Sequence, residues 1–503
     1  MRAVLPFGIS IVFLETVRIV VGMPFYDWHA ARLAPTFAWA DGVGLYQPAD
    51  SGPVLNTIYG PLSAVAYAPI LISRDPTTVV LIGGALNLLW LLAPLYLVLR
   101  ASGRPEEREC CWPLLGLIFF FVTALSFPFL AGIWYSLNHI HADASAYGLG
   151  LLACACACKK EGARPRLWLG LAALLAALAP WAKASAAFVA PALLVYLFVS
   201  RERPAFWFFV KVLFGAGLLT AIAIPLAFGP ERVWFNTFQL PLKHPFQYDV
   251  PFVLRDLYEK AIPSGGALML LLVLRFWARG RSWPLLDRVW FRENPWTLYV
   301  LIALCMLPIS IRSRLKLGCF DNNYTCLFYL HLALTMLLVQ YAREDRFRRL
   351  FVGWLCAGLL FASVALGAFK LLPRAEGLPE RIAAVRFNPQ QQAYDFCRVH
   401  PGLVYFPWNP LSTYLAEGKL YHFQYGVWDR HLAGYPLSPE HYAAHLPANA
   451  RYQAYALAEG RLSRAPNRPE DPELNALNGW LVEELTDERR KGIGFDDRLT
   501  KGE

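Results

Sequence analysis

The sequence predicts an all-α polytopic membrane protein with about eleven transmembrane helices and a small α/β extracytoplasmic domain at its C-terminal end. Of the 503 residues, 56% are hydrophobic and 17% are charged, whereas soluble domains carry about 25% charged residues. The charges gather between apolar runs of about 16 to 23 residues, which can cross a hydrocarbon core of about 30 Å as helices. Because backbone polar groups in lipid must pair within their own segment, these runs are expected to be helical.

The predicted crossing helices follow one another within residues 1–372, which form the predicted transmembrane domain. The first helix is expected to remain uncleaved, because no small-x-small cleavage site follows it. In chain order, the crossing helices are expected at residues 4–22, 77–99, 113–133, 140–158, 166–181, 185–200, 206–228, 264–278, 296–311, 325–341 and 350–372.

The distribution of Lys and Arg predicts the orientation of these helices. Five short linkers are basic, and they alternate as cytoplasmic segments if the N-terminus is also cytoplasmic. These linkers lie at residues 100–108, 159–166, 201–203, 275–292 and 343–349. An odd number of crossings then places residues 373–503 outside the cytoplasm, at an inner (cytoplasmic) membrane. Topology thereby explains the net charge of +10, and no nucleic-acid partner is expected.

Two segments outside the crossing helices have a recognisable character. Residues 23–76 are predicted to form a long outer loop, in which the apolar stretch 58–73 forms an interfacial or re-entrant helix. Counting 58–73 as a crossing would break the alternation of the basic linkers. In residues 373–503, "PQQQAYDFCRVHP" predicts a helix, "GLVYFP" a buried strand and "PLSTYLAEG" a helix closed by Gly418. This alternation predicts a small α/β domain.

Polar residues near the outer ends of the helices are the candidates for chemistry. Asp27 directly follows the first helix in "FYDWHAAR", where a carboxylate could accept a proton, hold a metal or be an ordinary loop acid. His139, His141 and Asp143 lie at the start of a crossing helix in "SLNHIHADASAYGLGL". His139 and Asp143 share a helical face, so they could bind a metal or a substrate phosphate, or simply cap the helix.

Cations on the outer side run against the orientation rule. Lys183 lies in an outer turn in "APWAKASAAF", where it either snorkels to the headgroups or binds a lipid phosphate. A denser cluster occupies residues 312–324, in which the cations suggest an anionic ligand such as a phosphate or pyrophosphate. Lipid headgroups are the alternative ligand. The residues of this cluster are Arg312, Arg314, Lys316, Asp321, Asn322, Asn323 and Tyr324.

These motifs resemble those of the GT-C glycosyltransferases, polytopic enzymes that take sugars from polyprenyl-phosphate carriers, such as the mannosyl- and aminoarabinose transferases. The similar elements are Asp27 after a short first helix, Tyr46, and "YGPL" at Tyr59 to Leu62. Further similarity lies in "HADASAYGLGLL", "WAKASAAFVAPALL" and "KLGCFDNNY". The sequence departs from the protein mannosyltransferases in having Tyr26 where their acidic pair would require a carboxylate.

The resemblance implies an inverting hexosyltransferase that moves a sugar to a glycan, lipid or protein acceptor. Asp27 would be the general base, and Lys183, Arg314 and Lys316 would bind the donor phosphate. A divalent metal, Mg or Mn, is left open, with Asp27, His141 and Asp143 as its ligands. The implied substrate-binding residues are Tyr46, Tyr59, His139, His141, Asp143, Asp321, Asn323 and Tyr324.

Two other classes of function remain open. A transporter or flippase of lipid-linked sugars would typically show inverted repeats and polar residues near the midplane. The sequence shows no internal repeat, and its polar candidates gather toward one face. A non-catalytic membrane scaffold that presents the C-terminal domain is the third hypothesis.

Overall fold

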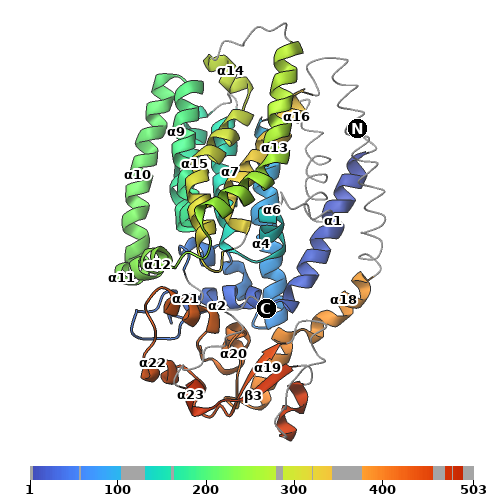
Figure 1. Cartoon of the computed structure of the whole chain (residues 1–503), viewed down its shortest axis with the longest axis vertical. Coiled ribbons are helices and arrows are strands. Elements are labelled where there is room, and N and C mark those ends of the chain that lie inside the picture. The colour runs from blue at the N-terminus through green and yellow to red at the C-terminus, as the bar shows by residue number, and fades with distance from the viewer. Residues whose placement is uncertain are drawn as a thin grey trace. The chain divides into compact units, whose positions relative to one another are not determined.

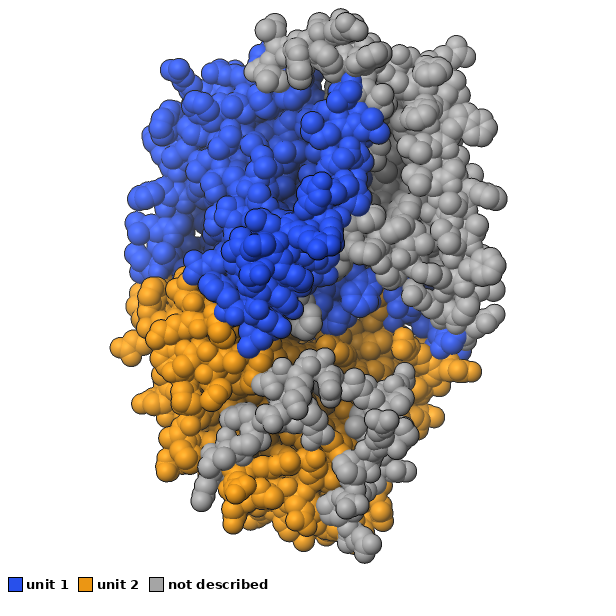
Figure 2. All heavy atoms as spheres, in the orientation of Figure 1, with its two compact units in different colours: residues 1–18, 87–222, 246–379 blue, residues 19–86, 223–245, 380–503 orange. Residues whose placement is uncertain are grey.

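The computed structural model describes most of the chain, and it is mostly helical (Figure 1). The described residues are 4–55, 58–102, 131–159, 164–278, 287–319, 321–341, 377–456, 471–477 and 480–490. They divide into two compact units, coloured in Figure 2. The first unit comprises residues 1–18, 87–222 and 246–379, and the second comprises 19–86, 223–245 and 380–503.

The first unit is built from helices. Helices α1, α4 and α10 supply residues to both units. Within the described residues, three helices are long and apolar enough to cross a membrane, namely α4, α10 and α15. The helical segments are α1 (Val4–Gly22), α4 (Pro76–Ser102), α6 (Ala131–Asn138), α7 (Ala142–Cys158), α8 (Pro165–Leu178), η5 (Ala179–Trp181), η6 (Ala184–Phe188), α9 (Val189–Ser200), α10 (Arg203–Phe228), α13 (Val250–Ala278), α14 (Arg288–Glu293), α15 (Trp296–Leu315), η8 (Asp321–Asn323) and α16 (Thr325–Tyr341).

Most predicted crossing helices correspond to one of these segments, and the total of about eleven crossings remains a prediction. Helix α13 differs most, because it begins at Val250 and not at residue 264. The residues that this helix adds before 264 include Asp256 and Lys260, which form an ion pair at 2.7 Å. The predicted helix 350–372 and all but the end of 113–133 lie outside the described residues.

Helix α7 approaches α4 closely at Gly148. A Cβ atom on this residue would lie 2.6 Å from the carbonyl oxygen of Trp90 and 2.7 Å from its indole ring. Both distances are shorter than van der Waals contact. A glycine is therefore required where these two helices pack.

The second unit contains short helices from three stretches of chain. The apolar segment 58–73 forms α3 and η2, each too short to cross a membrane. Pro61 precedes α3 and Pro69 lies at the start of η2, and both are positions at which a helix tolerates proline well. The helical segments are η1 (Met23–Phe25), α2 (Asp27–Ala40), α3 (Leu62–Val65), η2 (Ala68–Ile72), α11 (Pro230–Trp234), the π-helix η7 (Phe235–Gln239), α12 (Leu240–Lys243), α18 (Leu378–Ala384), η9 (Val385–Phe387), α19 (Pro389–Val399), α20 (Pro410–Glu417), α21 (Gln424–Leu432), α22 (Pro439–Ala444), η11 (Pro472–Leu477) and α23 (Asp487–Arg490).

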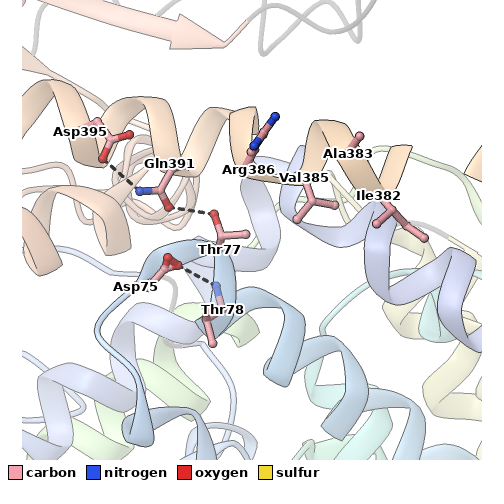
Figure 3. Close-up of a pocket in the computed structure, with 9 residues that line it drawn as sticks. All are labelled: Asp75, Thr77, Thr78, Ile382, Ala383, Val385, Arg386, Gln391 and Asp395. Carbon is pink, nitrogen blue, oxygen red and sulfur yellow. Dashed lines mark hydrogen bonds between the residues drawn. The ribbon is translucent and has the colours of Figure 1, made fainter. Parts of the chain in front are cut away.

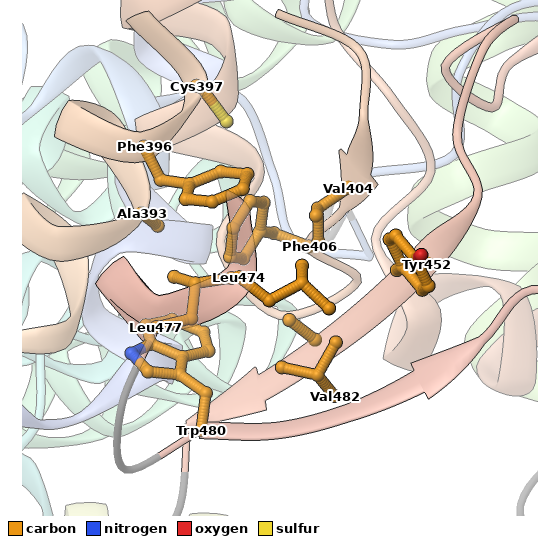
Figure 4. Close-up of a cluster of buried hydrophobic side chains, with 11 residues drawn as sticks. Ala393, Phe396, Cys397, Val404, Phe406, Tyr452, Leu474, Leu477, Trp480 and Val482 are labelled. Atoms are coloured by element: carbon orange, nitrogen blue, oxygen red, sulfur yellow. The ribbon is translucent and has the colours of Figure 1, made fainter. Parts of the chain in front are cut away.

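The C-terminal part of this unit contains a small mixed sheet, as the sequence predicts. Strands β1 (Val404–Tyr405), β2 (Tyr452–Ala456) and β3 (Trp480–Glu484) lie in the order β1-β2-β3. The pairing is parallel between β1 and β2 and antiparallel between β2 and β3. Figure 4 shows the apolar core between this sheet and α19. The predicted helices correspond to α19 and α20, and Gly418 ends α20 with a φ of +70°.

Residues 19–86 and the C-terminal residues of this unit are joined by backbone hydrogen bonds. The Phe423 amide donates to the Val54 carbonyl at 2.8 Å, and the Val54 amide donates to Nδ1 of His422 at 2.9 Å. Next to this contact, a Cβ atom on Gly426 would lie 2.8 Å from the Leu55 carbonyl oxygen. The predicted boundary at residues 372 and 373 lies outside the described residues, and the contacts group residues 19–86 with the C-terminal part.

His422 is held in its neutral form by this pairing. Its ring is fully buried, and Nδ1 must be unprotonated in order to accept the Val54 N–H. Burial, reinforced by neighbouring His445 and His441, lowers the pKa of His422 from 6.5 to about 3.

We expect the second unit to lose stability as the pH falls below about 6.5. Between pH 6.5 and 3 the unfolded chain protonates His422 and the folded chain does not, so stability rises with pH in this window. The slope is about 1.4 kcal/mol for each pH unit. Thermal unfolding of the full chain in detergent at several pH values measures this pH dependence of stability. His422→Gln should flatten the dependence, and His431→Gln, which changes an exposed histidine in the nearby helix α21, should not. Equal slopes in both variants would contradict the assignment.

Candidate active site

The carboxylate of Asp143 is the centre of a buried polar cluster in the first unit. Asp143 lies in the first turn of α7 and is 1% exposed. Its Oδ1 accepts from Nζ of Lys183 at 2.5 Å, and its Oδ2 accepts from Nδ2 of Asn322 at 2.8 Å. Nδ1 of His141, the residue that precedes α7, lies 2.6 Å from Oδ2. Three elements therefore converge on one carboxylate.

Lys183 reaches this carboxylate from a break between two helical segments. Pro180 lies in η5, and η6 begins after Lys183, whose backbone is extended with φ −147° and ψ 128°. The side chain is mostly buried, with 9% of the residue exposed. A lysine so placed needs a counter-charge, because an unpaired ammonium is costly to bury. Asp143 provides that charge, so the pair is the arrangement that lets the cation remain inside the protein.

His141 contacts both the side chain and the backbone of Asp143. The ring Nδ1 lies 2.6 Å from Oδ2 and 3.2 Å from the backbone nitrogen of Asp143. The shorter contact requires a proton on Nδ1, so we assign the ring as a donor to the carboxylate and not as an acceptor from the amide. The carboxylate of Asp143 thus accepts from three donors.

A second charged cluster lies in the same unit. Nζ of Lys260 lies 2.7 Å from Asp256 and 2.8 Å from Asp321. Nε of Arg314 lies 3.7 Å from a carboxylate oxygen of each of these aspartates. The Tyr324 hydroxyl donates to Asp256 at 2.6 Å. Burial alone would raise the pKa of Asp256, but the hydrogen bonds from Lys260 and Tyr324 hold it below its ordinary value.

The turn η8 connects the two clusters. Asp321 accepts from Lys260, while the next residue, Asn322, donates to Asp143. The predicted residue Asn323 contacts the Asn322 side chain at 3.3 Å. A change in either cluster would therefore act on η8, which also contacts the other cluster.

The structure adds three residues that the sequence prediction did not assign to the site, namely Asn322, Asp256 and Lys260. Asp256 and Lys260 are spaced four residues apart in "VLRDLYEKAIP", the spacing of an ion pair on one helical face. That spacing was the available signal. Asn322 carried no signal beyond its position in the 312–324 cluster.

Two of the other predicted residues of the first unit lie outside these contacts. His139 stacks on Tyr135 at 4.2 Å, and its Nδ1 lies 3.0 Å from the Tyr135 carbonyl oxygen. Lys316 follows the end of α15 and pairs with Phe246 in an isolated β-bridge.

The remaining predicted residues belong to the second unit. Asp27 is the first residue of α2. The Tyr46 hydroxyl donates to the carbonyl of Tyr59 at 2.6 Å, so these two predicted residues do meet. The structure thus brings together His141, Asp143 and Lys183, and also Arg314, Asp321, Asn323 and Tyr324, in one unit. Asp27, Tyr46 and Tyr59 belong to the other unit.

A pocket of about 710 Å³ opens in the second unit (Figure 3). Thr77 donates to Gln391 at 2.9 Å along its wall, and Gln391 donates to Asp395 at 3.0 Å. None of the predicted site residues lines it. The lining residues are Asp75, Thr77, Thr78, Ile382, Ala383, Val385, Arg386, Gln391 and Asp395.

His141 and Asp143 are two of the three residues suggested as metal ligands. A divalent cation at Asp143 would compete with the Lys183 ammonium, which lies 2.5 Å from Oδ1, and with Nδ1 of His141, which lies 2.6 Å from Oδ2. These contacts do not fit a bound metal. Among the described residues, no group of three or more His, Cys, Asp or Glu side chains could hold one. The positive charge beside Asp143 comes from Lys183.

Comparison with solved structures identifies the fold. No protein-family model and no curated protein sequence matches this chain. The crystal structure of ArnT from Cupriavidus metallidurans in the apo state matches with a TM-score of 0.52 and 12% identity, over 90% of this chain and 93% of that one. The chain therefore shares its overall fold with that ArnT structure, as the resemblance predicted from the sequence implies.

Two further structures are more distant. ArnT from Cupriavidus metallidurans bound to undecaprenyl phosphate has a TM-score of 0.47 and 12% identity, over 90% of this chain and 96% of that one. The archaeal oligosaccharyltransferase AglB from Archaeoglobus fulgidus, in complex with an inhibitory peptide and a dolichol-phosphate, has a TM-score of 0.40 and 12% identity, over 89% of this chain and 69% of that one.

Proposed function

We propose that this protein is a membrane glycosyltransferase that moves a sugar from a polyprenyl-phosphate carrier to an acceptor on the extracytoplasmic face. The supporting observation is the buried Lys183–Asp143 pair, held by Asn322 and His141 within a unit of GT-C fold. A cation buried at the end of apolar helices is suited to a lipid-linked phosphate, because its charge acts in a medium of low dielectric constant.

The proposed reaction is a direct displacement that inverts the anomeric centre. The acceptor oxygen attacks the anomeric carbon, the bond from that carbon to the phosphate oxygen breaks, and the phosphate leaves with the electron pair. The Asp27 carboxylate takes the proton of the acceptor hydroxyl. Lys183 has three N–H donors, of which one reaches Asp143, and the others are directed to the leaving phosphate. Arg314 and Lys316 add positive charge toward that phosphate.

The proposed setting is the inner membrane. The N-terminus lies in the cytoplasm and the C-terminal residues lie outside it, as the basic linkers predict. The partners are the lipid-linked sugar donor, the bilayer, and a glycan, lipid or protein that carries the acceptor hydroxyl. The second unit, which contains both Asp27 and the C-terminal residues, selects that acceptor.

Asp27→Asn is expected to abolish sugar transfer, because an amide cannot take the acceptor proton. The expected loss is about 10²-fold to 10⁴-fold. The assay is transfer of labelled sugar from a synthetic polyprenyl-phosphate sugar by the purified full chain in proteoliposomes. Asp50→Asn, at an exposed carboxylate of the same outer segment, is the matched control and should retain activity. Full activity in Asp27→Asn would end the assignment of the base. Movement of labelled carrier across the bilayer without any transfer would support a flippase instead.

A further inference from the structure

The pocket of the second unit has charges of both signs around one cavity of about 710 Å³ (Figure 3). This volume lies within the range of about 300–1,000 Å³ that is usual for small-molecule sites. Asp75 directly precedes α4, on one side of the pocket. Arg386 in η9 and Asp395 in α19 lie on the other side. All three residues belong to the second unit.

These charges do not neutralise one another. Among the described residues, none forms an ion pair with Arg386, Asp75 or Asp395. The Asp75 carboxylate accepts from the Thr78 amide at 3.1 Å through Oδ2, and the Asp395 carboxylate accepts from Gln391 at 3.0 Å through Oδ1. Within the same described part of the chain, the second oxygen of each carboxylate and the guanidinium N–H groups have no hydrogen-bond partner. A ligand can therefore use them.

A chain of hydrogen bonds holds one wall of the pocket. Asn388 is fully buried and donates to the Thr77 hydroxyl at 2.7 Å. Thr77 in turn donates to Gln391 at 2.9 Å, and Gln391 donates to Asp395 at 3.0 Å. The start of α4 and α19 are thus joined before any ligand binds, so little conformational freedom is lost on binding.

The pocket lies at the end of a helix that is long and apolar enough to cross a membrane. That helix, α4, begins at Pro76. Large apolar side chains next to the charged residues in sequence are exposed, namely Ile72 at 82% and Phe387 at 62%. Ile382, which lines the pocket, is 50% exposed. Exposed apolar side chains of this kind are stabilised at the boundary between lipid headgroups and acyl chains. The pocket is therefore suited to a ligand from the bilayer surface.

The charges of the pocket select a class of ligand. An anionic ligand would face two carboxylates, and a cationic ligand would face Arg386. A zwitterion can place its negative group at the guanidinium and its positive group at the carboxylates. Phosphoethanolamine is a zwitterion whose ammonium group has three N–H donors. Phosphocholine has none, so it cannot donate to Asp75 or Asp395.

We propose that this pocket binds the phosphoethanolamine headgroup of a bilayer phospholipid, with the phosphate at Arg386 and the ammonium group at Asp75 and Asp395. The exposed apolar side chains contact the acyl chains. A phospholipid held in this way anchors the second unit to the bilayer surface. None of the residues assigned to sugar transfer lines the pocket, so the inference does not depend on the proposed function.

The test is native mass spectrometry of the full chain in detergent, with phosphatidylethanolamine, phosphatidylcholine or phosphatidylglycerol added at equal concentration. The wild-type protein is expected to bind phosphatidylethanolamine at least about fivefold more tightly than either of the other lipids. Arg386→Gln should weaken this binding about tenfold, the usual cost of losing one charge-assisted hydrogen bond. Arg398→Gln is the matched control, because Arg398 is an exposed arginine of α19 that does not line the pocket.

The double variant Asp75→Asn with Asp395→Asn tests the other half of the site. The two amides can still accept from Thr78 and Gln391, but they cannot neutralise an ammonium group. This variant is expected to lose the preference for phosphatidylethanolamine over phosphatidylglycerol, because Arg386 then attracts an anionic headgroup without opposing carboxylates. Thermal unfolding of each variant confirms that it is folded.

Three results would overturn the inference. They are equal binding of the three lipids, equal binding of phosphatidylethanolamine by folded Arg386→Gln and Arg398→Gln, and an unchanged lipid preference in the double variant. Glycerophosphoethanolamine, the same headgroup without acyl chains, distinguishes the two sources of this zwitterion, and it is expected to bind more weakly than the lipid. Equally tight binding would identify a soluble ligand and reject the bilayer lipid. Because Asp27→Asn bears on none of these results, this inference and the proposed function can fail independently.

Discussion

Replacing Lys183 with methionine is expected to abolish sugar transfer and to destabilise the first unit. The activity should fall at least about 10²-fold, the usual cost of removing one group that stabilises developing charge. The free energy of unfolding should fall by about 3–5 kcal/mol, because Asp143, 1% exposed, would remain as a buried carboxylate without its cation. Transfer assays in proteoliposomes and chemical unfolding in detergent measure the two effects separately.

The double variant Asp143→Asn with Lys183→Met separates structure from catalysis. Removing both charges leaves no unpaired ion, so most of the lost stability should return, while transfer should remain absent. Lys183→Arg keeps the charge but changes its geometry, and partial activity is expected. A double variant that transfers sugar at the wild-type rate would exclude Lys183 from the reaction. A single Lys183→Met variant as stable as wild type would show that the ion pair is not buried.

Gly148→Ala is expected to destabilise the first unit by about 2–3 kcal/mol. The added methyl would lie 2.6 Å from the Trp90 carbonyl oxygen, and a backbone atom inside a helix cannot swing away. Helix α7 would have to move away from α4 and carry Asp143 with it, so transfer should also decrease. Thermal unfolding and the transfer assay measure both consequences.

Gly215→Ala in α10 is the matched control for this change. A Cβ atom there meets no other atom within 4 Å, so only the helix propensity changes, with a gain of up to about 1 kcal/mol. Equal stability of the two alanine variants would disprove the close packing at Gly148.

The helices could be predicted from sequence because their signals are local. The length of an apolar run can be read directly from the sequence. Helices α10 and α16 accordingly begin within a few residues of their predicted starts. Gly418 closes α20 because only glycine adopts a positive φ at low cost. Helix α2, which contains Pro35, lies within residues 23–76, where a long loop was predicted. Proline lowers the expectation of a helix, and tertiary packing overrode it here.

The candidate site was predictable only in part. Lys183 and Asp143 could be predicted as candidates because charged residues near the ends of apolar helices are energetically costly and are usually functional. Their pairing was not visible, since they are 40 residues apart, and Asn322 is 179 residues from the carboxylate that it contacts. Such contacts depend on how the helices pack against one another, which cannot be predicted from a local sequence pattern.

The hydrogen bond between Val54 and His422 joins residues that are 368 positions apart, which sets the order of events during synthesis. At a translation rate of about 5–20 residues per second, roughly 20 to 70 seconds pass between the synthesis of Val54 and the synthesis of His422. The segment around Trp28 and Val54 therefore spends that time without the chain that covers it, in a form that chaperones and proteases can recognise. The second unit is completed last, so a ribosome that stops early releases a protein in which residues 19–86 lack their C-terminal contacts.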